Sequence, residues 1–331
     1  MKVALIGCGR HMQSTLIPHL LHLPEYEVTV CVDIDEEAAE TARRMSHARY
    51  RVNAVEEIDM GEIDAALVAM PSDVAGSVTR FLIKNNIACF VEKSPANTSD
   101  EIEDLLTLAR LRDVYVQIGF NYRYADAIAN FYTRTAPYRE RPCVATLDFR
   151  SKHPSSSEWG IEDPVAAWLY HNGVHMLDLL RWLLGDVEHV HAELVEAAPP
   201  GKFLLVVQAR HSNGSVSTIR MGNMTGHFDI RLDLFTLEAH QFYMPHLGEV
   251  TQSLRDGRVA GDVLYRTPNL DNGRGRAGYG PELRYFAQNF QQSTTTAPSL
   301  ADALKASQLC DMILQSLDRQ NLMKPEMLSH R

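Results

Sequence analysis

The spacing of hydrophobic and polar positions follows two different patterns along this chain, and the change comes near residue 122. Before that point, short apolar runs typical of buried strands alternate with amphipathic stretches of helical period. The strands are expected at residues 3–6, 28–32, 65–69, 87–91 and 114–118. Strands that alternate with helices in this way predict a doubly wound parallel sheet, the Rossmann arrangement, over residues 1–122.

The pattern of residues 123–331 predicts an α+β domain. Together with the parallel sheet of the first domain, this places the chain in the α/β fold class. One strand is expected at 144–150, and further strands follow at 187–196, 204–211, 215–221, 230–235 and 240–243. The pair Asn213-Gly214 between two of these strands is a hairpin signal. Consecutive strands joined by turns predict a largely antiparallel sheet, and helical patterns at 281–293 and 300–317 close the chain.

Composition and charge narrow the class of protein. The formal net charge is −10, which opposes binding to nucleic acids or acidic membranes, since both need a positive field on the protein. No apolar run approaches the ~18 residues of a membrane span, and the run at 3–6 is too short for a signal peptide. The five cysteines are scattered without a C-x-x-C pair, a pattern typical of reduced thiols. We therefore expect a cytoplasmic protein without nucleic-acid or membrane partners.

A glycine-containing segment, Gly7-Cys8-Gly9-Arg10-His11-Met12, lies between the first strand and a helical pattern. In a dinucleotide-binding fold the first glycine permits the tight turn, and the second lets a pyrophosphate approach the backbone at the helix N-terminus. The third glycine of that fingerprint is replaced by Met12, so the motif is incomplete. The segment is therefore weak evidence by itself.

The second strand ends in Asp33, which strengthens the dinucleotide interpretation. A carboxylate at this place can accept hydrogen bonds from the ribose hydroxyls of NAD and repels the 2′-phosphate of NADP. The alternative is that Asp33 only caps the following helix. We expect NAD rather than NADP, bound by residues at the carboxyl ends of the strands. These are Gly7, Gly9, Arg10, His11, Met12, Asp33, Ile34, Met70, Pro71, Ser72, Glu92 and Lys93.

The apolar run at 87–91 ends in the charged pair Glu92-Lys93. In an open parallel sheet, ligands bind at the carboxyl ends of the strands, so Lys93 is a candidate for chemistry. The alternative is an ordinary solvated lysine at a strand end.

Three polar residues share one face of an otherwise apolar helix in the second half: His171, His175 and Asp178, at positions i, i+4 and i+7. Two histidines with an acid could hold a metal, but Asn172 replaces the glutamate that follows the first histidine in H-E-x-x-H proteases. A structural cluster is a second interpretation, and a proton carrier is a third. We expect no metal at this site.

Several segments in this order make the chain resemble the Gfo/Idh/MocA family of sugar and cyclitol oxidoreductases. They are Gly7-Cys8-Gly9-Arg10, Cys31-Val32-Asp33, Glu92-Lys93 with Pro95, Gly119-Phe120-Asn121-Tyr122-Arg123-Tyr124, and Gly173-Val174-His175 with Asp178 and Trp182. The resemblance implies a Rossmann domain followed by a domain with an open-faced sheet. Because that sheet often serves as a subunit interface in the family, a homodimer or homotetramer is expected.

The resemblance also implies a reaction: NAD-dependent hydride transfer at a hydroxyl or keto carbon of a sugar, cyclitol or nucleotide sugar. In this interpretation His175 carries the hydroxyl proton, Lys93 donates a hydrogen bond to the oxygen, and His171 relays the proton or binds the sugar. Which of Lys93 and His175 carries the proton stays open. Side chains with aromatic faces, an arginine fork or polar groups that suit a sugar are Asn121, Tyr122, Arg123, Trp168, His171 and Tyr279.

The chain departs from the family at two of these places. Ser94 stands where the family has the proline of Glu-Lys-Pro, which disfavours a cis peptide after Lys93, since a non-proline cis bond costs ~3 kcal/mol. His171 stands where the family often has an aspartate. These departures leave two alternatives: a sensor that binds NAD and a sugar without turnover, and a redox-neutral lyase or glycosidase that oxidises its substrate transiently.

Overall fold

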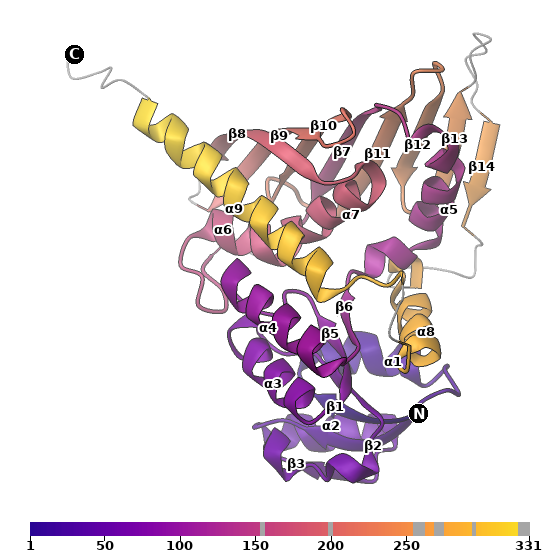
Figure 1. Ribbon diagram of the computed structural model, residues 1–331, viewed down its shortest axis with the longest axis vertical. Coiled ribbons are helices and arrows are strands. Elements are labelled where there is room, and N and C mark those ends of the chain that lie inside the picture. The colour runs from indigo at the N-terminus through magenta and orange to yellow at the C-terminus, as the bar shows by residue number, and fades with distance from the viewer. Residues whose placement is uncertain (153–155, 198–200, 254–261, 268–274, 293–295, 324–331) are drawn as a thin grey trace. The chain divides into compact units, whose positions relative to one another are not determined.

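The computed structural model describes residues 1–331 except 153–155, 198–200, 254–261, 268–274, 293–295 and 324–331 (Figure 1). It contains two compact units. The first consists of Met1–Ala125 and Leu270–Leu304, and the second of Asp126–Asn269 and Lys305–Arg331.

The first unit is built on six parallel strands in the order β3-β2-β1-β4-β5-β6, the doubly wound arrangement predicted from the sequence. The strands are β1 Lys2–Ile6, β2 Glu27–Val32, β3 Tyr50–Val52, β4 Ala65–Val68, β5 Ala88–Glu92 and β6 Val116–Gly119. Five of them match the expected apolar runs. The three-residue strand β3 was missed, because a segment so short and only half-buried has no recognisable period.

Helices complete the first unit, some of them with a side-chain cap at the first turn, as at Asp35 and Thr98. They are α1 Ile17–Leu20, which follows a π-helical turn at Met12–Leu16, then α2 Glu36–Ser46, α3 Ser72–Lys84, α4 Ser99–Arg112 and α8 Tyr279–Asn289. Short 3₁₀ turns lie at Val55–Glu57, Met60–Glu62, Asn121–Tyr124 and Gly275–Ala277. At the start of α4, Thr98 and Glu101 form a complete capping box.

The segment that contains α8 belongs to the first unit, although the sequence suggested that the second domain runs unbroken from residue 123 to 331. Two buried side chains of α8, Leu283 and Phe286, join the apolar core beneath the parallel sheet. The ring of Tyr115 stacks on Phe286 with the centroids 5.8 Å apart, and the Tyr26 hydroxyl donates to the carbonyl of Leu283 at 2.6 Å. This apolar burial explains why the chain returns to its first unit.

The second unit holds an eight-stranded sheet in the order β14-β13-β12-β11-β7-β10-β9-β8. The strands are β7 Val144–Arg150, β8 Val187–Ala197, β9 Lys202–His211, β10 Val216–Gly222, β11 Asp229–Phe235, β12 Gln241–His246, β13 Glu249–Ser253 and β14 Asp262–Arg266. Neighbouring strands are antiparallel except β7 and β10, so the prediction of a largely antiparallel sheet is confirmed. The last two strands were not expected from the sequence.

Helical segments pack against this sheet (Figure 1). They are α5 Asp126–Thr135, α6 Pro164–Trp168, a π-helical turn at Leu169–Gly173, α7 Val174–Leu184, a 3₁₀ turn at Ala136–Tyr138, and α9 Leu300–Met323, whose first five residues belong to the first unit. On β7, Ala145, Leu147 and Phe149 are buried whereas Val144 is 55% exposed. This alternation marks one covered face and one open face. Among the described residues, no helix is both long and apolar enough to cross a bilayer.

Candidate active site

The two glycines in the turn after β1 have different surroundings, and only Gly7 is required by the fold itself. Gly7 has a φ of +81°, and a Cβ there would lie 2.5 Å from the carbonyl oxygen of Ala69, so only glycine fits. A Cβ on Gly9 would meet no atom within 4 Å. Because the protein itself does not require a glycine at position 9, the open space there fits the close approach of a cofactor's pyrophosphate.

Asp33 is hydrogen-bonded both to this turn and to Asp35, the residue that caps the next helix. Its Oδ2 accepts a hydrogen bond from the backbone N–H of Cys8 at 2.7 Å, and its Oδ1 accepts one from the N–H of Asp35 at 2.9 Å. The N-cap of α2 is Asp35, so the alternative that Asp33 caps this helix is wrong. Each oxygen of Asp33 keeps a lone pair that can accept a ribose hydroxyl. The neighbouring Ile34 is 89% exposed.

The other predicted cofactor contacts around the turn differ in exposure. Met12, which stands at the third glycine position, is fully buried and packs in the core. Arg10 is exposed. At the end of β4, Met70 is half-buried and Pro71 is exposed, whereas Ser72 is buried and donates its hydroxyl to Asn97.

Glu92 and Lys93 lie at the carboxyl end of β5, the same edge of the sheet as Gly9 and Asp33. The Glu92 side chain is buried, and its Oε1 lies 3.0 Å from the Nε2 of His11. Lys93 is half-buried. The peptide bond between Lys93 and Ser94 is cis although residue 94 is not a proline, which removes the doubt about a cis peptide at this place.

Two predicted substrate contacts are engaged in the first unit's own structure. The amide of Asn121 is buried and donates to the carbonyl of Ala277 at 2.7 Å. The guanidinium of Arg123, 7% exposed, pairs with Asp302 at 2.9 Å. Burial by itself would raise the pKa of Asp302, but Arg123 and the backbone N–H of Ser299 outweigh it and hold that pKa below its ordinary value. These contacts give Asn121 and Arg123 a structural role.

Two tyrosines complete this part of the site. Tyr122 is half-buried, and burial raises the pKa of its phenol. Tyr279, at the start of α8, lies edge-on to the ring of His11 with the centroids 5.7 Å apart, and it stacks on His19 at 6.2 Å. Tyr279 is therefore a neighbour of the glycine turn, which its place in the sequence did not suggest.

In the second unit, the polar face predicted on one helix spans a π-helical turn and the start of α7. His171, His175 and Asp178 are 3%, 8% and 1% exposed. The ring of Trp159 lies edge-on to His171 with the centroids 4.2 Å apart. Within the part of the chain that the structure describes, no group of three or more His, Cys, Asp or Glu side chains could hold a metal ion.

Gly173 and Trp168 set the position of this helical segment on the sheet. A Cβ at Gly173 would lie 2.7 Å from the Leu169 side chain and 3.5 Å from the sulfur of Met221 on β10, so the missing side chain permits a close approach. Trp168 is fully buried between Phe149 and Phe203, and core packing accounts for it without a substrate.

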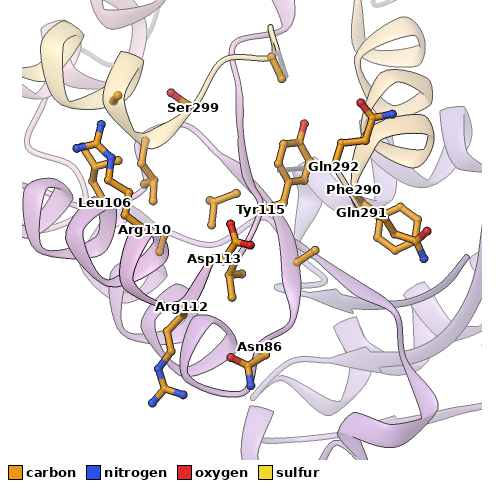
Figure 2. Close-up of a pocket in the computed structure, with 17 residues that line it drawn as sticks. Asn86, Leu106, Arg110, Arg112, Asp113, Tyr115, Phe290, Gln291, Gln292 and Ser299 are labelled. Atoms are coloured by element: carbon orange, nitrogen blue, oxygen red, sulfur yellow. The ribbon is translucent and has the colours of Figure 1, made fainter. Parts of the chain in front are cut away.

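A hollow of about 570 Å³ in the first unit lies away from these residues. Figure 2 shows Asn86, Asp113 and Tyr115 beside the C-terminal end of α4, and Phe290 and Gln292 after α8. Asn86 precedes β5 and Asp113 precedes β6, so the hollow is at the amino edge of the sheet, opposite Gly9 and Asp33. None of the predicted site residues lines it.

The parallel sheet, the turn that is open at Gly9 and the acid at Asp33 are features of a dinucleotide-binding Rossmann domain. Residues 1–120 match the Gfo/Idh/MocA family described as "Oxidoreductase family, NAD-binding Rossmann fold". The match covers the parallel-sheet part of the chain, where several of the motifs that suggested this family lie.

Known proteins resemble this chain in sequence or in fold. A relative from Amycolatopsis mediterranei (strain S699), "Putative UDP-kanosamine synthase oxidoreductase subunit", is 27% identical over 187 residues, which is 56% of this chain and about half (52%) of that protein. A dehydrogenase structure from Chromobacterium violaceum has a TM-score of 0.89 at 21% identity and covers 98% of this chain and 97% of that one. A levoglucosan dehydrogenase in complex with NADH has a TM-score of 0.82 at 18% identity and covers 97% of each chain. At these identities the two structures show a shared fold.

Proposed function

We propose that this protein is an NAD-dependent dehydrogenase or reductase that acts on a hydroxyl or keto carbon of a sugar, cyclitol or nucleotide sugar. The observation that carries the proposal is the placement of Lys93 at the carboxyl edge of the sheet, where Gly9 leaves an open backbone and Asp33 offers its carboxylate. The relatives support the substrate class, since one is a levoglucosan dehydrogenase and another is named for UDP-kanosamine synthesis.

NAD, when bound, supplies the carbon that accepts or returns the hydride. Gly9 and Asp33 would hold its pyrophosphate and ribose, and the charge of Asp33 would disfavour the 2′-phosphate of NADP. Lys93 would donate a hydrogen bond to the reacting oxygen and stabilise the negative charge that develops there. Removal of one such donor typically costs ~3 kcal/mol in the transition state.

His175 would take the hydroxyl proton in the oxidation and return it in the reduction, since an imidazole titrates near neutral pH. His171, buried beside Trp159, would relay this proton or bind the sugar. Two histidines one helical turn apart disfavour double protonation, so at least one of them would remain neutral and able to accept a proton.

The open face of the eight-stranded sheet would serve as the interface of a homodimer or homotetramer. Val144 pairs in register with Phe235 on one side and with Val216 on the other, and the three are 55%, 45% and 37% exposed. An apolar row of this kind on a sheet face is typical of a surface that another subunit covers.

The experiment that tests the proposed activity is a screen by absorbance at 340 nm, with NAD and with NADH, against free sugars, inositols, sugar phosphates and nucleotide sugars. Wild type is compared with Lys93→Met and with Lys84→Met, which removes an exposed lysine at the end of α3. We expect Lys93→Met to bind NAD but to lose turnover by about 100-fold or more, and Lys84→Met to match the wild type.

Each other outcome of the screen is informative. Near-normal turnover in Lys93→Met would remove Lys93 from the mechanism. NAD binding with silence across the panel would favour the sensor, and product formation without net NADH would favour the redox-neutral lyase.

A further inference from the structure

One hydrogen bond spans the carboxyl edge of the parallel sheet. His11 lies in the turn after β1, and Glu92 is the last residue of β5, yet their side chains meet at 3.0 Å. Strand β4 lies between β1 and β5 and pairs with both. The bond therefore passes over the end of β4. The chain leaves β1 toward β2 on one side and returns through β4 on the other, so this is the topological switch point, where doubly wound folds bind their ligand.

The carboxylate of Glu92 is held in place from the sheet side. Glu92 is 8% exposed and pairs in register with Gly119 on β6. A Cβ at position 119 would lie 2.9 Å from Oε2 of Glu92, so the carboxylate occupies the space of a missing side chain. The missing side chain of Gly119 therefore fixes the position of the Glu92 carboxylate.

His11 is held from the opposite side. Its ring is edge-on to Tyr279, whose own ring stacks on His19. The His11 side chain is 40% exposed, so the pair combines one accessible ring with one buried carboxylate. Contacts on both sides restrict the imidazole to the orientation in which it meets Glu92.

We infer that the His11–Glu92 pair makes the cofactor site prefer the oxidised over the reduced nicotinamide dinucleotide. This inference rests on the proposed NAD-dependent function. The nicotinamide ring is a cation in NAD⁺ and neutral in NADH, and the two forms are otherwise alike. Glu92 is the last residue of β5, at the carboxyl edge of the sheet, and it precedes Lys93, the residue proposed to act at the reacting oxygen. We therefore place its carboxylate at the nicotinamide end of the site. A carboxylate there lowers the free energy of the oxidised form alone. His11 is a positioning residue, since its bond keeps the carboxylate at that end.

The inference is tested on the dissociation constants of NAD⁺ and NADH, measured by titration calorimetry without substrate. Glu92→Gln keeps the shape of the side chain and removes its charge. We expect the ratio of the NAD⁺ constant to the NADH constant to rise roughly tenfold, the size of one charge interaction at moderate screening. The matched control is Glu27→Gln, which removes a charge at the amino edge of the sheet, at the start of β2. This control should leave the ratio unchanged.

The role of His11 is tested with two variants. His11→Leu removes the hydrogen bond and should shift the ratio in the direction of Glu92→Gln, whereas His11→Gln has an amide that can donate to Glu92 and should restore it. The double variant His11→Leu, Glu92→Gln should shift the ratio no further than Glu92→Gln alone. If Glu92→Gln does not fold, His11→Leu carries the test.

Two results overturn the inference in distinguishable ways. If both forms bind and Glu92→Gln weakens them equally, Glu92 only forms a hydrogen bond common to both, and the inference fails while the proposed function stands. If the wild type binds neither form, the proposed function fails and the inference fails with it.

Discussion

The carboxylate of Glu92 occupies the space that a side chain on Gly119 would fill. The two residues are partners in the register of β5 and β6, and a Cβ on Gly119 would lie 2.9 Å from Oε2 and 3.2 Å from the Cα of Glu92. The side chain of Glu92 on the neighbouring strand β5 therefore explains why a glycine stands at the end of β6. The same carboxylate also contacts His11. The space at Gly119 therefore sets the position of Glu92 and, through Glu92, the contact with His11.

Gly119→Ala should displace the Glu92 carboxylate and break its bond with His11. We expect a loss of about 1–2 kcal/mol in the free energy of unfolding, as for other overpacked sites. The ratio of the NAD⁺ to the NADH dissociation constant should rise, as it does in Glu92→Gln. Urea denaturation and calorimetry measure both. The control is Gly226→Ala, where an added Cβ meets no atom within 4 Å. An unchanged ratio in Gly119→Ala would show that Glu92 does not need this space.

Gly9→Ala should separate cofactor binding from folding. An added Cβ meets no protein atom within 4 Å at this position, so we expect the melting temperature to stay within about one degree of the wild type. The methyl group would enter the space through which a pyrophosphate reaches the backbone, and the affinity for NAD should fall by roughly tenfold or more. Thermal denaturation and calorimetry are the measurements. If Gly9→Ala binds NAD normally, the cofactor does not approach the turn at this residue.

Two substitutions of Asp33 separate its charge from its hydrogen bonds. Asp33→Ala removes the acceptor for the Cys8 N–H as well as the acceptor for the ribose, so the affinity for NAD should fall. Asp33→Asn keeps an acceptor oxygen and removes the charge, so it should gain affinity for NADP while it retains more of its affinity for NAD. Dissociation constants for both cofactors decide the question. A wild type that already prefers NADP would contradict the role assigned to Asp33.

Local pattern was enough to predict most of the parallel sheet, because most of its strands are short apolar runs that alternate with amphipathic helices. The return of α8 could not be predicted, since Leu283 and Phe286 have the spacing of any amphipathic helix and only the folded chain brings Tyr115 beside them. Strands β13 and β14 were missed for a related reason: their residues are mostly half-buried, so no clear alternation of apolar and polar positions marks them.

The candidate site divides in a similar way. Asp33 and Lys93 were predicted as site residues because each lies at the end of an apolar strand. The contact between His11 and Glu92 joins residues 81 positions apart and left no local signal. Arg123 was expected to bind a substrate because an arginine fork suits a sugar, and its partner Asp302 is 179 positions away. Long-range pairs of this kind decide whether a charged residue is available for a ligand. A single sequence does not show which distant residues are in contact.

The buried His211 should make the second unit less stable in mild acid. Its ring is 1% exposed, with Nδ1 at 2.8 Å from the carbonyl oxygen of Gly185 and Nε2 at 2.9 Å from the hydroxyl of Ser217. Burial lowers the pKa of His211, and the nearby Arg181 adds to this effect. An unfolded histidine takes up a proton near pH ~6.5, whereas the folded one takes it up only at a lower pH. Stability from this group is therefore complete above about pH 6.5 and is lost as the pH falls below that value.

The loss should be visible as a difference between variants in melting temperature from pH 7.5 to 5.0. His211→Gln has no titrating ring, so its melting temperature should fall less steeply over this interval than that of the wild type, even if it starts lower. One uncompensated proton changes stability by at most ~1.4 kcal/mol per pH unit, which bounds the difference in slope. His227→Gln, at an exposed position, should follow the wild type. Parallel curves for His211→Gln and the wild type would mean that His211 takes up its proton in the folded state as easily as in the unfolded chain.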